Sequence, residues 1–172
     1  MSKKVLITGG NKGIGLAVSR AMLEFGYEVI IVARDFDTCP LVGVENVTAI
    51  EYDLSNVDAL PELAKTVGNI DILINNAGYM QPKYTYNNYP KDAREHIMNV
   101  DLYTPVELMN IFCEHMKKQK YGRIVNTASI AGQIGHPDVW YGIAKAGLIN
   151  ATKIYGKMLG AYGITVNCVA PS

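Results

Sequence analysis

Short apolar runs rich in β-branched residues alternate along the chain with longer segments in which apolar residues recur at helical spacing. The runs have the length of buried strands and contain few polar positions, which is the pattern of strands enclosed on both faces. They cover Lys4–Thr8, Glu28–Ala33, Val47–Tyr52, Ile70–Asn75, Arg123–Thr127 and Ile164–Val169. The pattern therefore predicts six buried strands.

Four segments between these runs have the periodicity of helices. They cover Gly13–Phe25, Val57–Val67, Pro90–Lys120 and Asp138–Ala161. Pro105 interrupts the third segment, and Pro61 in the second either occupies a first turn or breaks the helix. Only Asp35–Glu45, between the second and third runs, has the composition of a loop. Apolar strands that alternate with helices predict a doubly wound α/β fold with a parallel sheet covered on both faces.

Length and composition narrow the possibilities further. The 172 residues suit one domain, and we expect residues 1–172 to form a single unit. The charges balance, with 16 Lys and Arg against 16 Asp and Glu, which disfavours nucleic acid as a partner. No apolar run approaches the roughly 20 residues that a membrane-spanning helix needs, and no secretory segment is evident. We expect no nucleic-acid or membrane partner.

The residues that could hold a metal ion or form disulfides are scattered. The cysteines and histidines are Cys39, Cys113, Cys168, His96, His115 and His136. Their number and spacing match neither a disulfide framework nor a zinc site, so we expect no metal. Reduced thiols are typical of the cytoplasm, which is the location that we expect.

A glycine-rich turn follows the first predicted strand and leads directly into the first predicted helix. It spans Thr8–Gly15 with the sequence TGGNKGIG. Glycines at such a turn let the backbone bend tightly and approach a pyrophosphate, whose charge is favoured by the free N–H groups at the helix start. A merely structural strand-to-helix turn is the competing interpretation. The position between a strand and a helix favours nucleotide binding.

Tyr141 and Lys145 are four residues apart in the last predicted helix and therefore lie on one face of it. A nearby ammonium stabilises a tyrosinate, which lowers the pKa of a phenol from about 10 and suits it to acid or base work nearer neutrality. If the fifth strand ends at Ser129, the serine hydroxyl and the phenol converge at the carboxyl edge of the sheet. A solvated surface pair is the alternative for a tyrosine and a lysine alone.

These motifs together resemble the short-chain dehydrogenase/reductase family. The resemblance rests on the spacing of Thr8–Gly15, on Asn75–Gly78 after the fourth strand, on Ser129, and on Tyr141 four residues before Lys145. The resemblance extends over residues 3–172. Within the family, the chain resembles members of the 3-oxoacyl-reductase and sugar-dehydrogenase types. It implies a Rossmann fold with strand order 3-2-1-4-5-6.

The resemblance also implies catalytic roles. Tyr141 would exchange a proton with a carbonyl or alcohol oxygen while a hydride passes to or from a nicotinamide, and Ser129 would hydrogen-bond that oxygen. Lys145 would hold the nicotinamide ribose and perturb Tyr141. Asn99 would match the asparagine of a water-linked proton relay, although an ordinary polar helix residue is a serious competing interpretation.

The implied cofactor-binding set follows the loops after the strands. It comprises Gly9, Asn11, Lys12, Gly13, Ile14, Gly15, Arg34, Asp53, Leu54, Asn75, Ala77, Gly78, Tyr141, Lys145 and Pro171. Asp53 has the alternative of a simple turn residue at a strand end. An arginine after the second strand accommodates the 2′-phosphate of NADP, whereas an acid there binds the ribose of NAD. Arg34 and Lys12 favour NADP(H), while Asp35 keeps NAD(H) open.

Three further expectations come from the resemblance. The substrate, a small carbonyl compound or alcohol, would lie between the segments Tyr79–Pro90 and Gln133–Trp140, although tyrosines at 79, 84, 86 and 89 equally suit a loop packed by its own aromatic rings. The helices at Leu102–Lys117 and after Tyr141 would form a homodimer or homotetramer, with Gly142, Ala144, Ala146 and Gly147 permitting close approach. Family members continue beyond Pro171 with a lid, a seventh strand and a helix, so the chain resembles a truncated member.

The sequence therefore predicts an NADP(H)-dependent oxidoreductase that acts on a carbonyl compound or a secondary alcohol. The alternative is a nucleotide-binding sensor or scaffold, or an inactive fragment, that binds the cofactor without turnover. Intact Ser129, Tyr141 and Lys145 argue for the enzyme, and the short carboxyl end argues for the alternative.

Overall fold

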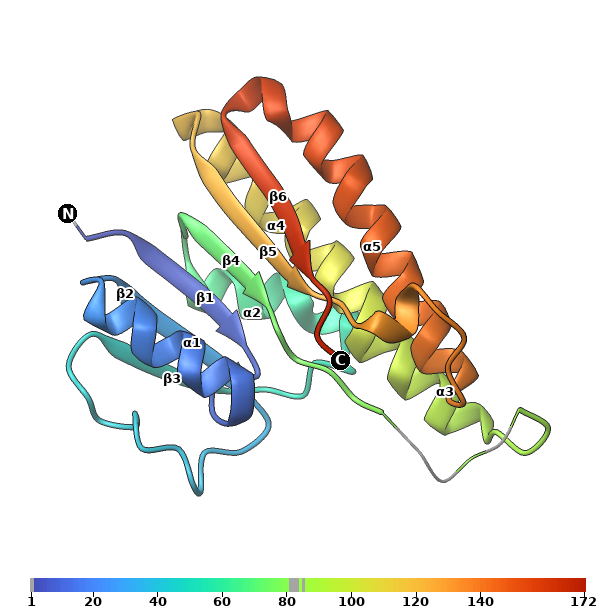
Figure 1. Ribbon diagram of the computed structural model, residues 1–172. Coiled ribbons are helices and arrows are strands. Elements are labelled where there is room, and N and C mark those ends of the chain that lie inside the picture. Colours follow the sequence, from blue (N-terminus) through green and yellow to red (C-terminus); the bar gives the residue numbers. More distant parts are fainter. Residues whose placement is uncertain (1, 81–83, 85) are drawn as a thin grey trace.

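A computed structural model describes residues 2–80, 84 and 86–172, and six strands in this part of the chain form one sheet (Figure 1). The strands are β1 (Lys4–Thr8), β2 (Glu28–Ala33), β3 (Val47–Glu51), β4 (Ile72–Asn75), β5 (Gly122–Thr127) and β6 (Ile164–Val169). Every neighbouring pair is parallel, and the spatial order is β3-β2-β1-β4-β5-β6. The predicted fold class and strand order are confirmed.

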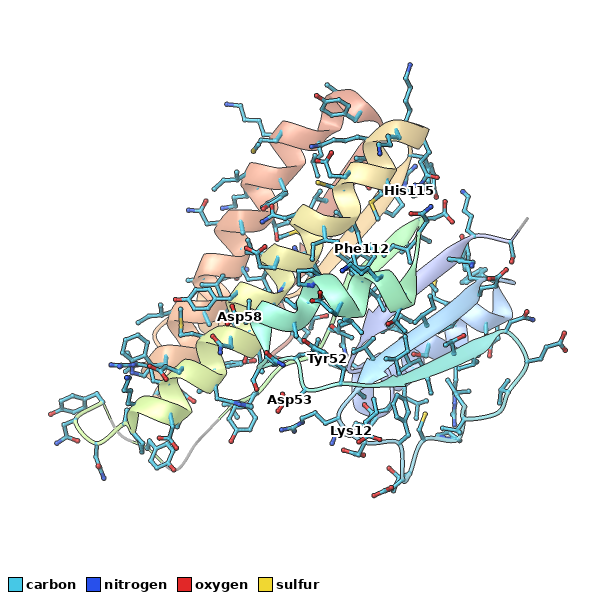
Figure 2. All side chains as sticks on the ribbon, turned by 180° about the vertical axis from the view of Figure 1, so that it is seen from behind. Lys12, Tyr52, Asp53, Asp58, Phe112 and His115 are labelled. Carbon is cyan, nitrogen blue, oxygen red and sulfur yellow. The ribbon has the colours of Figure 1, made fainter. Side chains whose placement is uncertain are left out.

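Helices cover both faces of this sheet. They are α1 (Gly13–Glu24), α2 (Leu60–Val67), α3 (Lys91–Met98), α4 (Thr104–Gln119) and α5 (Val139–Leu159). On one face, α2, α4 and α5 enclose a core that includes Leu6, Leu73 and Ile124 (Figure 2, where Phe112 of α4 lies near α2). On the other face, Val5, Ile7 and their neighbours pack against α1. Consecutive residues of one strand thus serve opposite cores, which explains why the strand sequences are apolar throughout.

The two outer strands are less enclosed than the sequence predicts. In β3 every residue is at least partly exposed, and β6 alternates between buried and exposed positions. Both strands have only one neighbour in the described sheet, so one side of each is less covered. The prediction of six buried strands is therefore wrong for β3, and β6 is buried only at alternate positions.

The two prolines act in different ways. Pro61 lies in the first turn of α2, after a short 3₁₀ turn at Val57–Ala59, so the predicted helix is kept. Pro105 also lies in a first turn, that of α4, but a π-helical turn at Asn99–Tyr103 separates α4 from α3. Proline has no N–H to donate to the fourth preceding carbonyl, so the regular helical pattern fails just before it.

Candidate active site at the carboxyl edge of the sheet

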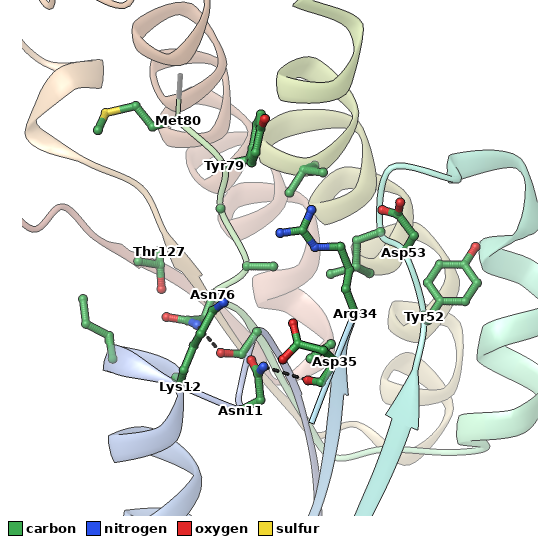
Figure 3. Close-up of a pocket in the computed structure, with 18 of the residues that line it drawn as sticks. Asn11, Lys12, Arg34, Asp35, Tyr52, Asp53, Asn76, Tyr79, Met80 and Thr127 are labelled. Atoms are coloured by element: carbon green, nitrogen blue, oxygen red, sulfur yellow. Dashed lines mark hydrogen bonds between the residues drawn. The ribbon is translucent and has the colours of Figure 1, made fainter. Parts of the chain in front are cut away.

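A cleft lies where the carboxyl ends of β1 to β5 meet, which is the position at which ligands bind in open α/β sheets (Figure 3). Its volume is about 370 Å³, within the range of small-molecule sites. Residues from the loops after these strands line it, together with parts of α3 and α5. Lining residues that the sequence predicted as cofactor-binding are Gly9, Asn11, Lys12, Ile14, Gly15, Arg34, Asp53, Leu54, Ala77, Gly78 and Tyr141.

The glycine-rich turn has a geometry that only glycine permits. Gly9 and Gly13 have φ angles of +64° and +54°, in the left-handed region. A Cβ atom on Gly15 would lie 2.0 Å from the carbonyl oxygen of Gly9, far inside van der Waals contact. The Asn76 side chain fixes the conformation of the turn, because its Nδ2 donates hydrogen bonds to the carbonyl oxygens of Thr8 and Gly9, each at 3.2 Å.

The amino end of α1 opens into this cleft and suits an anionic group. Lys12 occupies the N-cap position, no side chain caps the helix, and its first turn contains no acidic residue. The amides of a first helical turn lack intrahelical acceptors and favour negative charge. The turn leaves no room for side chains, and the start of the helix has no side-chain cap. Both features fit the pyrophosphate of a dinucleotide.

Acidic and basic groups face each other on the far side of the cleft, after β2 and β3. Arg34 is exposed and points into the cleft beside Asp53 (Figure 3). The backbone N–H of Ser55 lowers the pKa of the Asp53 carboxyl, and the charges of His96 and Arg34 contribute. Asn11 Nδ2 donates to the backbone carbonyl of Asp35 at 2.8 Å, which fixes the turn after β2 next to the glycine-rich turn.

Asn75 does not line the cleft as the sequence predicted. Its side chain is buried and donates to Asn126 Oδ1 at 2.8 Å, and Asn126 in turn donates to Thr152 Oγ1 at 2.9 Å. The neighbouring Asn76 lines the cleft instead. Consecutive side chains at a strand end point in opposite directions, so one of two adjacent asparagines must face the core.

Tyr141 and Lys145 lie together in α5, as their spacing predicted. Asp138 caps this helix by accepting a hydrogen bond from the Tyr141 N–H at 3.1 Å. Lys145 Nζ lies 5.6 Å from the centroid of the Tyr141 ring and donates to the carbonyl of Thr127, at the end of β5, at 2.9 Å. Lys145 is buried, whereas Tyr141 is half-buried and lines the cleft. The ammonium therefore lies deeper in the protein than the phenol.

Ser129 follows β5 and is largely buried. Its Oγ accepts a hydrogen bond from the Ala131 N–H at 3.1 Å and lies 3.5 Å from the carbonyl oxygen of Pro171. The Pro171 carbonyl also accepts from the Ile130 N–H at 3.0 Å. A Cβ on Gly132 would lie 2.6 Å from the Lys145 backbone, so this serine-bearing turn packs directly against α5.

Asn99 is not brought to the Tyr141–Lys145 pair. Its Nδ2 donates to the backbone carbonyl of Ser55 at 2.9 Å. Asp101, which the sequence analysis did not single out, contacts Lys145 instead, with Oδ1 at 2.9 Å from Nζ. The expectation that Asn99 belongs to a water-linked proton relay stays a prediction.

Aromatic residues gather at the end of the cleft near Tyr141. Tyr79 packs edge-on against His96 with ring centroids 4.4 Å apart, and both line the cleft. The Tyr89 hydroxyl donates a hydrogen bond to the Asp138 carboxylate at 3.1 Å. Burial is the main cause that raises the pKa of the Tyr89 phenol, and the Asp138 carboxylate is the second. Residues 81–83 and 85 of the expected substrate segment lie outside the described residues.

Metal-ligating side chains, free thiols and long apolar helices were the other features that the sequence raised. Within residues 2–80, 84 and 86–172, no group of three or more His, Cys, Asp and Glu could hold a metal ion. Cys39, Cys113 and Cys168 are free thiols. Among the described helices, none combines the length and the apolar character that crossing a bilayer requires.

The sheet order, the glycine-rich turn and the carboxyl-edge cleft define a dinucleotide-binding α/β protein. A family model described as short chain dehydrogenase matches residues 3–172. An acetoacetyl-CoA reductase from Shinella zoogloeoides is 34% identical over 178 residues, which cover 99% of this chain and 73% of the relative. The chain belongs to the short-chain dehydrogenase family and is an NAD(P)-dependent oxidoreductase by class.

Two solved structures resemble the fold closely. A 4-hydroxyisoleucine dehydrogenase complexed with NADH superimposes with a TM-score of 0.92 at 28% identity, covering 99% of this chain and 75% of that one. A metagenomic short-chain oxidoreductase in complex with NADP gives a TM-score of 0.90 at 27% identity, with 99% and 81% coverage. The family thus uses both nicotinamide cofactors on this fold.

Proposed function

We propose that the protein interconverts a carbonyl compound and a secondary alcohol with NADP(H). The observation that carries this proposal is the position of Tyr141, which lies at the same cleft as the glycine-rich turn, with the buried Lys145 ammonium one helical turn away. A protein that only senses a nucleotide has no need for a phenol and an ammonium beside the cofactor site.

The chain's own residues would manage the proton. In reduction, the Tyr141 hydroxyl donates a proton to the carbonyl oxygen, and in oxidation the tyrosinate removes it from the alcohol. Lys145, fixed by the Thr127 carbonyl, stabilises the negative charge that remains on Tyr141. Ser129 adds a hydrogen bond that polarises the same oxygen. The bound cofactor supplies the hydride.

The substrate class follows from the relatives and the cleft. Acetoacetyl-CoA, the substrate in the name of the reductase from Shinella zoogloeoides, is a 3-oxoacyl thioester. Tyr79, Met80 and His96 contribute aromatic and apolar surface to the cleft. We therefore expect NADPH consumption with a 3-oxoacyl thioester in a panel that also contains sugars and simple ketones. Consumption with none of them would contradict the proposed reaction.

The choice between the cofactors rests on Arg34 and Lys12. Both are exposed cations that line the cleft on loops able to reach an adenosine ribose, and a 2′-phosphate is a dianion. We expect NADPH to bind more tightly than NADH. Charge-assisted hydrogen bonds contribute roughly 1.5–3 kcal/mol, so Arg34→Ala should reduce that preference about 10- to 100-fold in titration calorimetry.

Arg20→Ala is the matched control, because Arg20 is an exposed arginine of α1 that does not line the cleft. It removes the same net charge without touching the cofactor loops. Equal affinities for NADPH and NADH in the unaltered protein would contradict the assignment to Arg34 and Lys12. Tighter binding of NADH would instead assign the selection to Asp35.

We also propose that the protein is a homodimer. The small residues of α5 expected at the interface are partly turned inward, because Ala144 is buried and Gly147 abuts Leu102 of the same chain. Other residues present an apolar stripe: Ile154 and Met158 of α5 are 51% and 64% exposed. Such a stripe, one helical turn long, suits an isologous contact between two copies of the chain.

Light scattering tests this arrangement. We expect the mass of two chains of 18.8 kDa at micromolar concentration and a monomer for Ile154→Lys, since the substitution places a charge in the apolar contact. Phe25→Lys is the control, because Phe25 is 77% exposed at the distant end of α1. A monomeric unaltered protein would overturn the proposed dimer.

A further inference from the structure

Asp101 is a fully buried carboxylate in the π-helical turn between α3 and α4. Its exposure is 0%, and that of its partner Lys145 is 2%. Oδ1 lies 2.9 Å from Lys145 Nζ, and Oδ2 accepts a hydrogen bond from the Tyr79 N–H at 3.0 Å. The carboxylate therefore joins the catalytic helix to the loop after β4, on which the cleft depends.

This arrangement carries a large desolvation penalty. A buried carboxylate and a buried ammonium each lose their hydration, and their attraction repays the loss only with good geometry and further hydrogen bonds. The two groups lie at ion-pair distance, and each also has a backbone partner, because Thr127 accepts a hydrogen bond from Lys145 and Tyr79 donates to Asp101. Gly78 leaves the necessary room, since a Cβ there would lie 3.1 Å from Oδ1.

We propose that Asp101 is a positioning residue that holds the Lys145 ammonium by direct ion pairing and moderates its charge toward Tyr141. The inference rests on the proposed function and deepens it. The ammonium lies 5.6 Å from the Tyr141 ring, close enough to stabilise a tyrosinate. A carboxylate 2.9 Å from the ammonium offsets part of that stabilisation, so Asp101 sets the pH range in which Tyr141 exchanges its proton.

The charged and titratable groups around the pair are few. His96 from α3 acts on Asp101, Lys145 contacts it from α5, and the Tyr79 N–H donates to it from the loop after β4. Burial raises the pKa of the Asp101 carboxyl above its ordinary value, and the Lys145 ammonium opposes that rise. The geometry that carries the proposal is the 2.9 Å contact between these two buried groups.

The first test follows the ionisation of Tyr141 without requiring turnover. Tyrosinate absorbance is titrated in the unaltered protein and in Asp101→Asn, and the same spectra with Tyr141→Phe added are subtracted. We expect Asp101→Asn to move the appearance of this tyrosinate about one pH unit lower, because the ammonium is no longer offset. The pH profile of kcat should move in the same direction. Asp92→Asn, an exposed change in α3, should move neither.

The second test measures the coupling of the pair by thermal unfolding. Asp101→Asn and Lys145→Met should each lower Tm by about 6–20 °C, because each leaves a buried charge unpaired. The double variant should lose clearly less than the sum of the two shifts. Additive shifts would show that no direct ion pair exists and would overturn the proposal.

The outcomes separate this inference from the proposed function. Coupled Tm shifts with an unmoved tyrosinate titration would make Asp101 purely structural and would also overturn the proposal. A moved titration in a protein that never oxidises NADPH would support the role of Asp101 while contradicting the proposed reaction. If Asp101→Asn does not fold, Asp101→Glu, which keeps the charge, should fold and leave the Tyr141 titration within a few tenths of a pH unit.

Discussion

Replacing Tyr141 with phenylalanine should lower kcat by about 10²–10⁴ while NADPH still binds. The substitution removes only the hydroxyl oxygen that exchanges the proton, and the ring remains beside Lys145. The glycine-rich turn and the amino end of α1 are distant from this atom in the chain and supply the expected pyrophosphate contacts. Steady-state rates and calorimetric affinities measured on the same preparation separate the two effects.

Tyr162→Phe is the matched control for that experiment. Tyr162 is exposed in the 3₁₀ turn after α5 and lies near Lys117, so it also pairs a phenol with an ammonium but does not line the cleft. We expect its kcat to equal that of the unaltered protein. Unchanged turnover in Tyr141→Phe would remove the tyrosine from the reaction.

The second large effect is expected at Gly15. In Gly15→Ala the new methyl group would lie 2.0 Å from the Gly9 carbonyl oxygen and 2.5 Å from Asn76 Nδ2, so the turn must open. The dissociation constant for NADPH should rise by at least about 100-fold, or about 2.7 kcal/mol. Titration calorimetry measures this loss, and circular dichroism verifies that the fold persists.

Gly160→Ala is the control for the glycine experiment. Gly160 lies in the turn after α5, has ordinary helical dihedral angles, and a Cβ there meets no atom within 4 Å. Its NADPH affinity should match that of the unaltered protein. An undiminished affinity in Gly15→Ala would mean that the dinucleotide does not bind against this turn.

Much of the fold could be predicted because each strand and helix carries its own local pattern. The inner strands serve two cores and contain continuous apolar runs, and apolar residues of the helices recur at the helical period. The exposure of β3 is not encoded in the local pattern of Val47–Glu51, because it follows from the position of this strand at the edge of the sheet. The π-helical turn before Pro105 could not be predicted either, because several backbone conformations can accommodate the N–H that proline lacks.

The parts of the site that depend on sequence spacing could be predicted. The parts that depend on the direction in which a side chain points could not. The spacing of Thr8–Gly15 places a turn between a strand and a helix, at the carboxyl edge of the sheet. The i, i+4 spacing of Tyr141 and Lys145 places both on one face of a helix. The choice between Asn75 and Asn76 depended on which one faces the core. No motif or spacing in the sequence indicates a role for Asp101, because only the fold brings its carboxylate to Lys145.

The transfer of an isotope tests the central claim most directly. NADPH carrying deuterium on the transferred position of its nicotinamide is incubated with the protein and a 3-oxoacyl thioester, and the product alcohol is examined by mass spectrometry. We predict one deuterium in each alcohol molecule formed and almost none with Tyr141→Phe. Tight binding of NADPH without any deuterium in a product, across 3-oxoacyl, sugar and simple carbonyl substrates, would contradict the account and identify a protein that only binds the nucleotide.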